Sequence, residues 1–191
     1  RLIEKTNIKP KPMVEVGGMP VIWHIMKLYS YYGYNDFLIC LGYKGSVIVD
    51  YFKSFFSKNN NMEIQETDDS VKIITNGPEK WHINLVETGE KTMTGGRIYK
   101  VKKHLDNKRF FLTYGDGVSN VNIKKLLNFH ISNKKRCTLT AVKPEPRFGA
   151  LVLEDNLVTN FREKNLIDVD WINGGYFVCE PSIFEHIKNN D

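Results

Sequence analysis

Short apolar segments alternate with amphipathic segments along most of this chain. The short segments are continuous apolar runs bounded by glycine or polar residues, which is typical of buried strands. In the segments between them, apolar residues recur every three or four positions, which is typical of one helix face. The expected strands are residues 37–41, 81–86, 109–114, 138–142, 150–153, 158–161 and 171–179, and the expected helices are residues 20–32, 47–56, 96–105, 122–131 and a segment from Pro181. This alternation predicts an α/β fold with a mostly parallel sheet in three layers.

One polar stretch departs from this alternation. Residues 62–65 and 71–75 have period-two patterns, which predict an inserted β-hairpin. No internal repeat or linker divides the 191 residues, so we expect a single domain over residues 1–191.

Composition narrows the classes of partner. The net charge of +5 is compatible with small anionic substrates. The sequence has neither a concentrated basic face nor a recognisable nucleic-acid-binding module, so we expect no nucleic acid partner. Because no apolar run approaches membrane-spanning length and no signal peptide is visible, we expect a cytoplasmic protein without membrane association.

The chain has three cysteines, Cys40, Cys137 and Cys179, and their spacing fits no zinc-binding pattern. We expect all three to be buried thiols in a protein of a reducing compartment.

A carboxylate, Asp116, lies between Gly115 and Gly117 at the end of the expected strand 109–114. In open α/β sheets, ligands bind just beyond the carboxyl ends of the strands. A carboxylate at such a position can bind Mg²⁺ together with substrate phosphates. By itself Gly-Asp-Gly favours an ordinary turn, so its function depends on phosphate-binding partners elsewhere in the chain.

Lys9 and Lys11 alternate with Pro10 and Pro12 in an expected extended loop before the first helix. The prolines stiffen the loop, which lowers the entropy cost of holding a lysine at a phosphate site. We expect at most one of the two lysines to point at a substrate. The competing interpretation is a solvated basic loop.

Residues 92–97 (Thr-Met-Thr-Gly-Gly-Arg) follow a strand and begin a helix. The hydroxyls, the two glycines and the fork of Arg97 predict an anion or nucleotide cradle. Capping of the helix by Thr94 is a second, compatible interpretation. The chain has no Walker A and no Gly-x-Gly-x-x-Gly motif, which disfavours a P-loop kinase and a Rossmann dehydrogenase.

Polar residues also occur at two later strands. Glu163 and Lys164 end one strand, and Asn173 and Gly174 lie near the start of the next. A carboxylate, an amide and glycine backbone can bind sugar hydroxyls, while a lysine can neutralise a phosphate. The alternatives are a surface ion pair and a glycine bulge.

Together, these motifs resemble those of the sugar-phosphate nucleotidylyltransferases, and among them most closely the cytidylyl branch. The resemblance extends from Arg1 to about Ile187. Its most specific stretches are residues 9–18, 22–27, 92–97, 113–117, 147–150 and 172–177. The Met-Thr-Gly-Gly-Arg segment is the one that indicates the cytidylyl branch.

The resemblance implies a Rossmann-like nucleotidylyltransferase fold and a cytidylyl transfer from CTP to glucose 1-phosphate, which gives CDP-glucose and pyrophosphate. It implies Mg²⁺ as the cofactor and small-molecule substrates, and members of the family are often homo-oligomers. It further implies a role in nucleotide-sugar biosynthesis for lipopolysaccharide O-antigens.

The resemblance also implies roles for individual residues. By match, Lys11 contacts the phosphates at the reacting centre, Arg1 is a further catalytic residue, and Asp116 binds Mg²⁺. The residues matched to nucleotide and sugar-phosphate binding, besides Lys11, are Thr92, Arg97, Gly115, Glu163, Lys164, Asn173 and Gly174. Asn165 stands where the family usually has proline.

The ends of the chain predict a partial domain. Of the family's first strand and its Gly-x-Gly-Thr-Arg loop, only Arg1 is expected here, and a second Mg²⁺ aspartate is expected beyond Asp191. We therefore expect exposed edges in the sheet and no measurable pyrophosphorylase activity from this chain alone.

Two other functions remain open from the sequence. Asp168 and Asp170 form an Asp-x-Asp pattern, which many metal-dependent glycosyltransferases use. In that class Asp116 would not be needed to bind metal. The other alternative is a nucleotide-sugar-binding module without catalytic activity.

Overall fold

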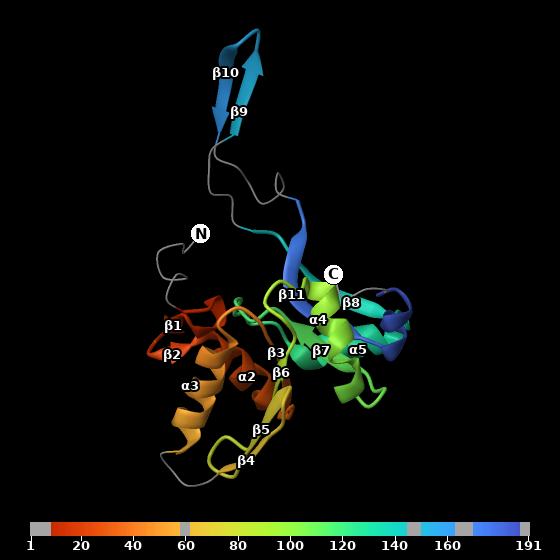
Figure 1. Ribbon diagram of the computed structural model, residues 1–191. Coiled ribbons are helices and arrows are strands. Elements are labelled where there is room, and N and C mark those ends of the chain that lie inside the picture. The colour runs from red at the N-terminus through yellow and green to blue at the C-terminus, as the bar shows by residue number, and fades with distance from the viewer. Residues whose placement is uncertain (1–8, 58–61, 145–149, 163–169, 188–191) are drawn as a thin grey trace.

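Two sheets lie side by side in the computed structural model and form most of the fold (Figure 1). The structure describes residues 9–57, 62–144, 150–162 and 170–187. The four-stranded sheet has the order β3-β6-β5-β4, with β3 at Asp36–Leu41, β4 at Met62–Glu66, β5 at Ser70–Thr75 and β6 at His82–Glu87. The three-stranded sheet has the order β7-β11-β8, with β7 at Phe110–Thr113, β8 at Cys137–Val142 and β11 at Ile172–Cys179.

The strand pairing is more antiparallel than the alternation predicted. Among the described strands, β3 and β6 form the one parallel pair, and the other ladders are antiparallel. In the three-stranded sheet the reason is that β11 inserts between β7 and β8 and runs against both. In the four-stranded sheet, the expected hairpin β4–β5 adds to the edge of β6. The sheets are therefore mixed rather than mostly parallel.

Two small hairpins complete the described strands. One pairs β1 (Glu15–Val16) with β2 (Met19–Pro20), and the other pairs β9 (Ala150–Glu154) with β10 (Leu157–Arg162). Each forms a separate two-stranded sheet (Figure 1).

The described helices are α2 (Val21–Tyr31), α3 (Gly45–Ser57), α4 (Thr94–Lys100) and α5 (Ile123–Asn133), with 3₁₀ helices η1 (Lys11–Met13), η2 (Lys102–His104) and η4 (Pro181–Glu185). Asn122 caps α5 because its side-chain oxygen accepts a hydrogen bond from the Lys125 amide at 2.9 Å. Lys134 ends the same helix in the left-handed conformation, with φ 49°. None of these helices combines the length and the apolar character that crossing a bilayer requires.

In three segments the type or the length of the helix differs from the sequence prediction. The expected helix 96–105 begins at Thr94, ends at Lys100 and continues as the separate turn η2. Thr94 does not cap α4, because Met93 occupies the N-cap position and no side chain bonds there. Lys11–Met13 forms a 3₁₀ turn rather than an extended loop, and the segment from Pro181 is likewise a 3₁₀ turn.

Helix α2 connects two hydrophobic clusters. Ile22 and Met26 pack with α3 and with residues of β3, β5 and β6. Val21, Ile25 and Tyr29 pack with α5 and β11. Each set follows the spacing of one helix face, and the two faces are adjacent. By contributing to both cores, α2 holds the two sheets together.

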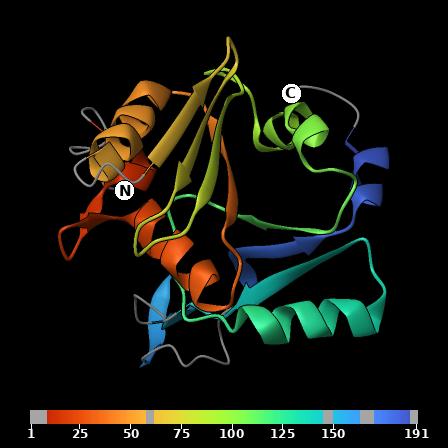
Figure 2. The same cartoon turned by 90° about the horizontal axis from the view of Figure 1, so that it is seen from below.

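Helices cover both faces of the four-stranded sheet (Figure 2). On β6, Ile83 and Leu85 belong to the cluster that contains α2 and α3. Asn84 points to the opposite face, where its amide lies 3.5 Å from the His104 ring nitrogen of η2. Since successive strand residues face opposite ways, α2 and α3 lie on one face and α4–η2 on the other. This is the predicted three-layer arrangement.

Strands β3 and β7 are edge strands, and each pairs on one side only among the described strands. All four residues of β7 are half-buried, although the sequence predicted a buried strand. Phe111 contributes to the core by packing against Tyr29 and Tyr34. The segments that follow β3 and β7 carry residues of the site.

Candidate active site

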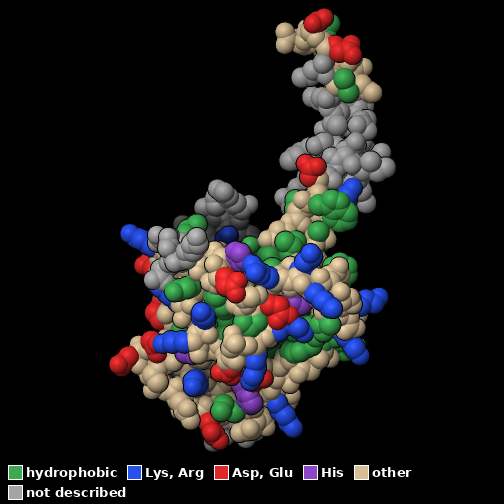
Figure 3. All heavy atoms as spheres, turned by 90° about the vertical axis from the view of Figure 1, so that its right-hand side faces the viewer, with side chains coloured by type: hydrophobic (Ala, Val, Ile, Leu, Met, Phe, Trp, Pro, Cys, Tyr) green, Lys and Arg blue, Asp and Glu red, His purple; other side chains and the backbone are tan. Residues whose placement is uncertain are grey.

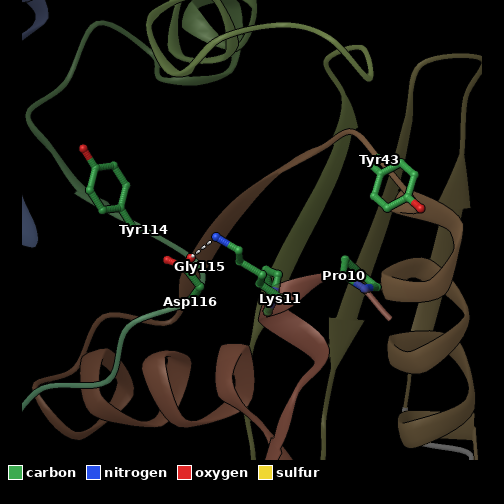
Figure 4. Close-up of a pocket in the computed structure, with 7 residues that line it drawn as sticks. Pro10, Lys11, Tyr43, Tyr114, Gly115 and Asp116 are labelled. Carbon is green, nitrogen blue, oxygen red and sulfur yellow. Dashed lines mark ion pairs between the residues drawn. The ribbon is translucent and has the colours of Figure 1, made fainter. Parts of the chain in front are cut away.

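A hollow of about 530 Å³ lies where η1 meets the segments that follow β3 and β7 (Figure 4). It is lined by Pro10, Lys11, Pro12, Tyr43, Tyr114, Gly115 and Asp116. Its polar centre is an ion pair in which Lys11 Nζ lies 3.5 Å from Asp116 Oδ2. The structure therefore brings together three residues that the sequence assigned to one site: Lys11, Gly115 and Asp116.

The η1 turn directs Lys11 into this pocket. The Met13 amide donates to the Pro10 carbonyl at 2.8 Å, and Met13 itself is buried in the core. Lys11 extends from the turn toward Asp116 (Figure 4). Lys9 instead pairs with Glu15 at 2.7 Å. As the sequence predicted, one of the two lysines points into the site.

Gly115 and Asp116 are held close to the proline-marked turn. A Cβ at Gly115 would lie 3.0 Å from Pro12 Cγ, so a side chain there would require the Pro12 ring to shift by a few tenths of an ångström. At Gly117 a Cβ would meet nothing within 4 Å. Of the two glycines that flank Asp116, the first is therefore the closely packed one.

Two buried tyrosines, Tyr176 and Tyr29, support the loop after Asp116. Tyr176 is 1% exposed and its hydroxyl donates to the Gly117 carbonyl at 3.0 Å. Tyr29 stacks on Tyr176 and hydrogen-bonds to the Thr113 hydroxyl. Burial raises the pKa of both tyrosines above the ordinary value, so both stay protonated and able to donate.

Asn173 and Gly174, which the sequence assigned to sugar phosphate, lie at the start of β11. Asn173 donates to the Tyr114 hydroxyl at 3.2 Å and accepts from the Gly175 amide at 2.8 Å. Tyr114 thus links Asn173 to the pocket wall. A Cβ at Gly174 would lie 3.0 Å from the Thr140 carbonyl oxygen, so this glycine allows the close approach of β8.

Thr92 and Arg97 lie in a separate cluster and do not line the pocket. The Arg97 guanidinium donates to the Leu41 carbonyl at 2.8 Å, to the Thr88 hydroxyl at 2.7 Å and to the Glu90 carbonyl at 3.2 Å. Thr92 donates to the Thr88 carbonyl at 2.7 Å. In this structure these side chains hold the ends of β3 and β6 together, whereas the sequence predicted a nucleotide cradle.

Five residues singled out from the sequence lie outside the described residues: Arg1, Glu163, Lys164, Asn165 and Asp168. Asp170, the other half of the Asp-x-Asp pattern, is described and exposed.

Comparison with known proteins places the chain in a family. The family model described as nucleotidyl transferase matches residues 1–191. The chain belongs to the nucleotidyl transferase family. It is therefore a nucleotidyltransferase, and this membership argues against the glycosyltransferase alternative.

Among relatives, the chain is 44% identical to glucose-1-phosphate cytidylyltransferase of Salmonella typhi, over all of this chain and 74% of that protein. It is 40% identical to a probable glucose-1-phosphate cytidylyltransferase of Bacillus subtilis, with the same coverage.

Solved structures confirm the nucleotidylyltransferase fold. HddC from Yersinia pseudotuberculosis superposes with a TM-score of 0.66 at 20% identity, over 95% of this chain and 72% of that one. UDP-glucose pyrophosphorylase in complex with UDP-glucose gives a TM-score of 0.63 at 16% identity, over 97% and 73% of the two chains. The predicted α/β class is confirmed by these neighbours.

Nucleotidyltransferases generally use a divalent metal. Across the described ranges, no three His, Cys, Asp or Glu side chains gather into a metal-binding group. The single carboxylate of Asp116 is nevertheless suited to binding a divalent metal, because the Asp116 side chain is 44% exposed and borders the pocket. Mg²⁺ is commonly held by one or two carboxylates plus substrate phosphates.

Two aromatic residues that line the pocket, Tyr43 and Tyr114, were not predicted as site residues from the sequence. Tyr43 follows β3 by two residues and is 54% exposed, and Tyr114 follows β7 directly and is 40% exposed. Both lie beyond the carboxyl end of a strand, where ligand-binding loops are expected. Figure 4 shows them on opposite sides of the Lys11 side chain. Tyr43 lies just after the predicted strand 37–41 and Tyr114 is the last residue of the predicted strand 109–114, so their positions at strand ends were a signal available in the sequence.

Proposed function

We propose that this protein transfers a cytidylyl group from CTP to glucose 1-phosphate, forming CDP-glucose and releasing pyrophosphate. The observation that carries the proposal is the Lys11–Asp116 pair, 3.5 Å apart, in a pocket at the ends of two strands. The choice of base and sugar is supported by the 44% and 40% identity to the two cytidylyltransferases over the whole chain.

In this reaction the phosphate oxygen of glucose 1-phosphate attacks the α-phosphorus of CTP. The bond from that phosphorus to the pyrophosphate group breaks, and pyrophosphate leaves with the electron pair. No covalent bond to the protein is needed, so catalysis consists of positioning and of stabilising negative charge. Lys11 supplies a cation for the phosphates from a turn that is already ordered.

Asp116 is the residue that would hold Mg²⁺, which when bound neutralises triphosphate charge. The Lys11–Asp116 ion pair is exposed, with 69% and 44% of the two side chains accessible. Exposed pairs contribute little to stability, so exchanging this contact for contacts to substrate costs little. Lys11 can thus turn from the carboxylate to a phosphate oxygen without disturbing the fold.

The remaining assignments follow the family match. We assign Thr92, Arg97 and Gly115 to the nucleotide side, with Arg97 acting through the Leu41–Tyr43 segment that it holds. Asn173 and Gly174 are assigned to glucose 1-phosphate, together with Glu163 and Lys164, and Arg1 to the phosphates. Residues 1–191 are proposed as one nucleotidylyltransferase domain that works in the cytoplasm and that can assemble with further copies of itself.

A nucleotide panel tests the proposal. The protein as its gene encodes it would be incubated with glucose 1-phosphate, Mg²⁺ and one of CTP, UTP, dTTP, GTP or ATP, while pyrophosphate release is followed. We expect kcat/KM for CTP to exceed that for each other nucleotide by at least about tenfold, a difference of about 1.4 kcal/mol in transition-state binding. Faster turnover of UTP or dTTP would overturn the cytidylyl assignment.

A further inference from the structure

Two of the three cysteines face each other across neighbouring strands. Cys137 of β8 and Cys179 of β11 are direct register partners in an antiparallel ladder. Their Sγ atoms lie 3.7 Å apart. Cys179 is fully buried, whereas Cys137 is exposed, contrary to the sequence prediction of three buried thiols. An accessible thiol therefore lies in contact with a buried one.

We propose that Cys137 and Cys179 are a modification site that closes to a cross-strand disulfide on reaction with a small disulfide oxidant such as oxidised glutathione. Directly opposite residues of an antiparallel pair have Cα atoms about 4.5 or 5.5 Å apart, and disulfides span about 4.4–6.8 Å between Cα atoms. The backbone thus already has the required spacing. Closing the gap between the sulfurs needs side-chain rotation rather than strand movement.

The chemistry proceeds in two exchange steps. The thiolate of Cys137 attacks one sulfur of oxidised glutathione, which forms a mixed disulfide and expels one glutathione thiolate. The thiolate of Cys179 then attacks the sulfur of Cys137, which forms the protein disulfide and expels the second glutathione. Two protein thiols are oxidised by two electrons, one oxidant disulfide is reduced to two thiols, and the two protons end on the released glutathione.

Accessibility sets the order of these steps. Of these two thiols only Cys137 is open to a soluble oxidant, so it reacts first. Burial raises the pKa of the Cys179 thiol well above its ordinary range, and the neighbouring Cys137 raises it further. When Cys137 has become a mixed disulfide its own charge no longer opposes ionisation of Cys179. Ring closure is then expected to accelerate with rising pH.

Positive charge near Cys137 favours an anionic oxidant. Lys134, Lys135 and Arg136 immediately precede it, and with Arg109 they line a hollow of about 260 Å³. Glu180 at this hollow is already paired with Arg109 at 2.6 Å. Figure 3, which faces the side of α5 and β8, shows many lysine and arginine side chains on this surface. Oxidised glutathione carries net negative charge, so these cations raise its local concentration.

The test uses the folded, reduced protein and excess oxidised glutathione at about pH 8, near the ordinary thiol pKa. Free thiols counted after denaturation are expected to fall from three to one per chain, with Cys40 as the remaining thiol. Peptide mapping should find the peptides of Cys137 and Cys179 joined. The melting temperature should rise by at least about 3 °C and return on reduction.

Matched variants separate this outcome from others. Cys40→Ser should leave no free thiol after oxidation and keep the rise in melting temperature. Cys137→Ser, at an exposed position, should fold like the parent and lose both the bridge and the rise. The proposal is overturned if all three thiols survive oxidation, if glutathione stays attached to Cys137, or if the bridge involves Cys40 or a second chain.

Discussion

The ammonium of Lys11 lies 3.5 Å from the carboxylate of Asp116, although Lys11 belongs to η1, near the start of the described chain, and Asp116 follows β7. Both side chains are accessible from the pocket, and neither is needed for the core. Such a pair adds little to stability, and its position at strand ends suits phosphate chemistry. Substitutions in and around this pocket can therefore separate catalytic contributions from structural ones.

Lys11→Met should reduce kcat/KM for CDP-glucose formation by about 10²–10³-fold, as expected for loss of one preorganised charge at the reacting phosphates. The unfolding free energy should change by less than about 1 kcal/mol, because the ion pair is exposed. Lys9→Met is the matched control, since Lys9 pairs with Glu15 outside the pocket. Equal losses in both variants, measured by steady-state kinetics, would contradict a specific role for Lys11.

Tyr176→Phe should weaken the support of the Asp116 loop. It removes the hydroxyl that donates to the Gly117 carbonyl at 3.0 Å. We expect a loss of about 1 kcal/mol in unfolding free energy and a lower kcat at nearly unchanged KM. Denaturant unfolding and steady-state kinetics measure these two effects. Tyr31→Phe, at a side chain 83% exposed, should change neither, and an unaffected Tyr176→Phe enzyme would count against the positioning role.

Arg97→Lys should lower the free energy of unfolding by roughly 2 kcal/mol. The reason is that a lysine ammonium cannot reproduce the hydrogen bonds that the planar guanidinium donates to Leu41, Thr88 and Glu90. Chemical denaturation with both nucleotide-free proteins provides the measurement. If the variant is as stable as the parent but has a raised KM for CTP, the guanidinium binds nucleotide directly, as the sequence first suggested.

Glu180 makes the stability of the folded protein sensitive to acid. Burial opposes ionisation, but the hydrogen bonds and charges of Arg109 and His130 outweigh it and lower the pKa of the Glu180 carboxyl. A lowered folded-state pKa means that its stabilisation is complete above the unfolded value of about 4.3 and is lost as the pH falls through the folded value. Glu180→Gln should therefore flatten the loss of melting temperature below about pH 4.3. Glu185→Gln is the control, because the Glu185 side chain is 63% exposed. Its melting temperature should fall with decreasing pH as steeply as that of the parent protein.

Much of the fold was predictable because local patterns agreed with the tertiary structure. The spacing of α2 and α3, and the hairpin β4–β5, were correctly inferred from periodicity. The direction of strand pairing was not, because the place of β11 between β7 and β8 depends on contacts between distant segments. Periodicity reports which residues face a core, and it carries no information on strand order.

The site was predictable only where the backbone sequence itself constrained geometry. Lys11 and Gly115 lie where the prolines and the strand end indicated. Arg97 was assigned to the nucleotide from its residue type and helix position, yet its partners include the carbonyl of Leu41, which is distant in sequence. Hydrogen bonds between such segments leave no local pattern. Tyr176 was not singled out for the same reason, since its contact to Gly117 crosses between β11 and the loop after β7.

The most direct test compares Asp116→Asn with Asp170→Asn in the protein as its gene encodes it. CDP-glucose formation from CTP and glucose 1-phosphate would be measured over a range of Mg²⁺ concentrations. We predict that Asp116→Asn lowers kcat/KM by about 10²–10³-fold and raises the Mg²⁺ concentration needed for half-maximal rate, while Asp170→Asn stays within about twofold of the parent, as is usual for an exposed surface substitution. Retained activity in Asp116→Asn, or its loss in Asp170→Asn alone, would contradict the assignment of the metal and phosphate site to the Lys11–Asp116 pocket.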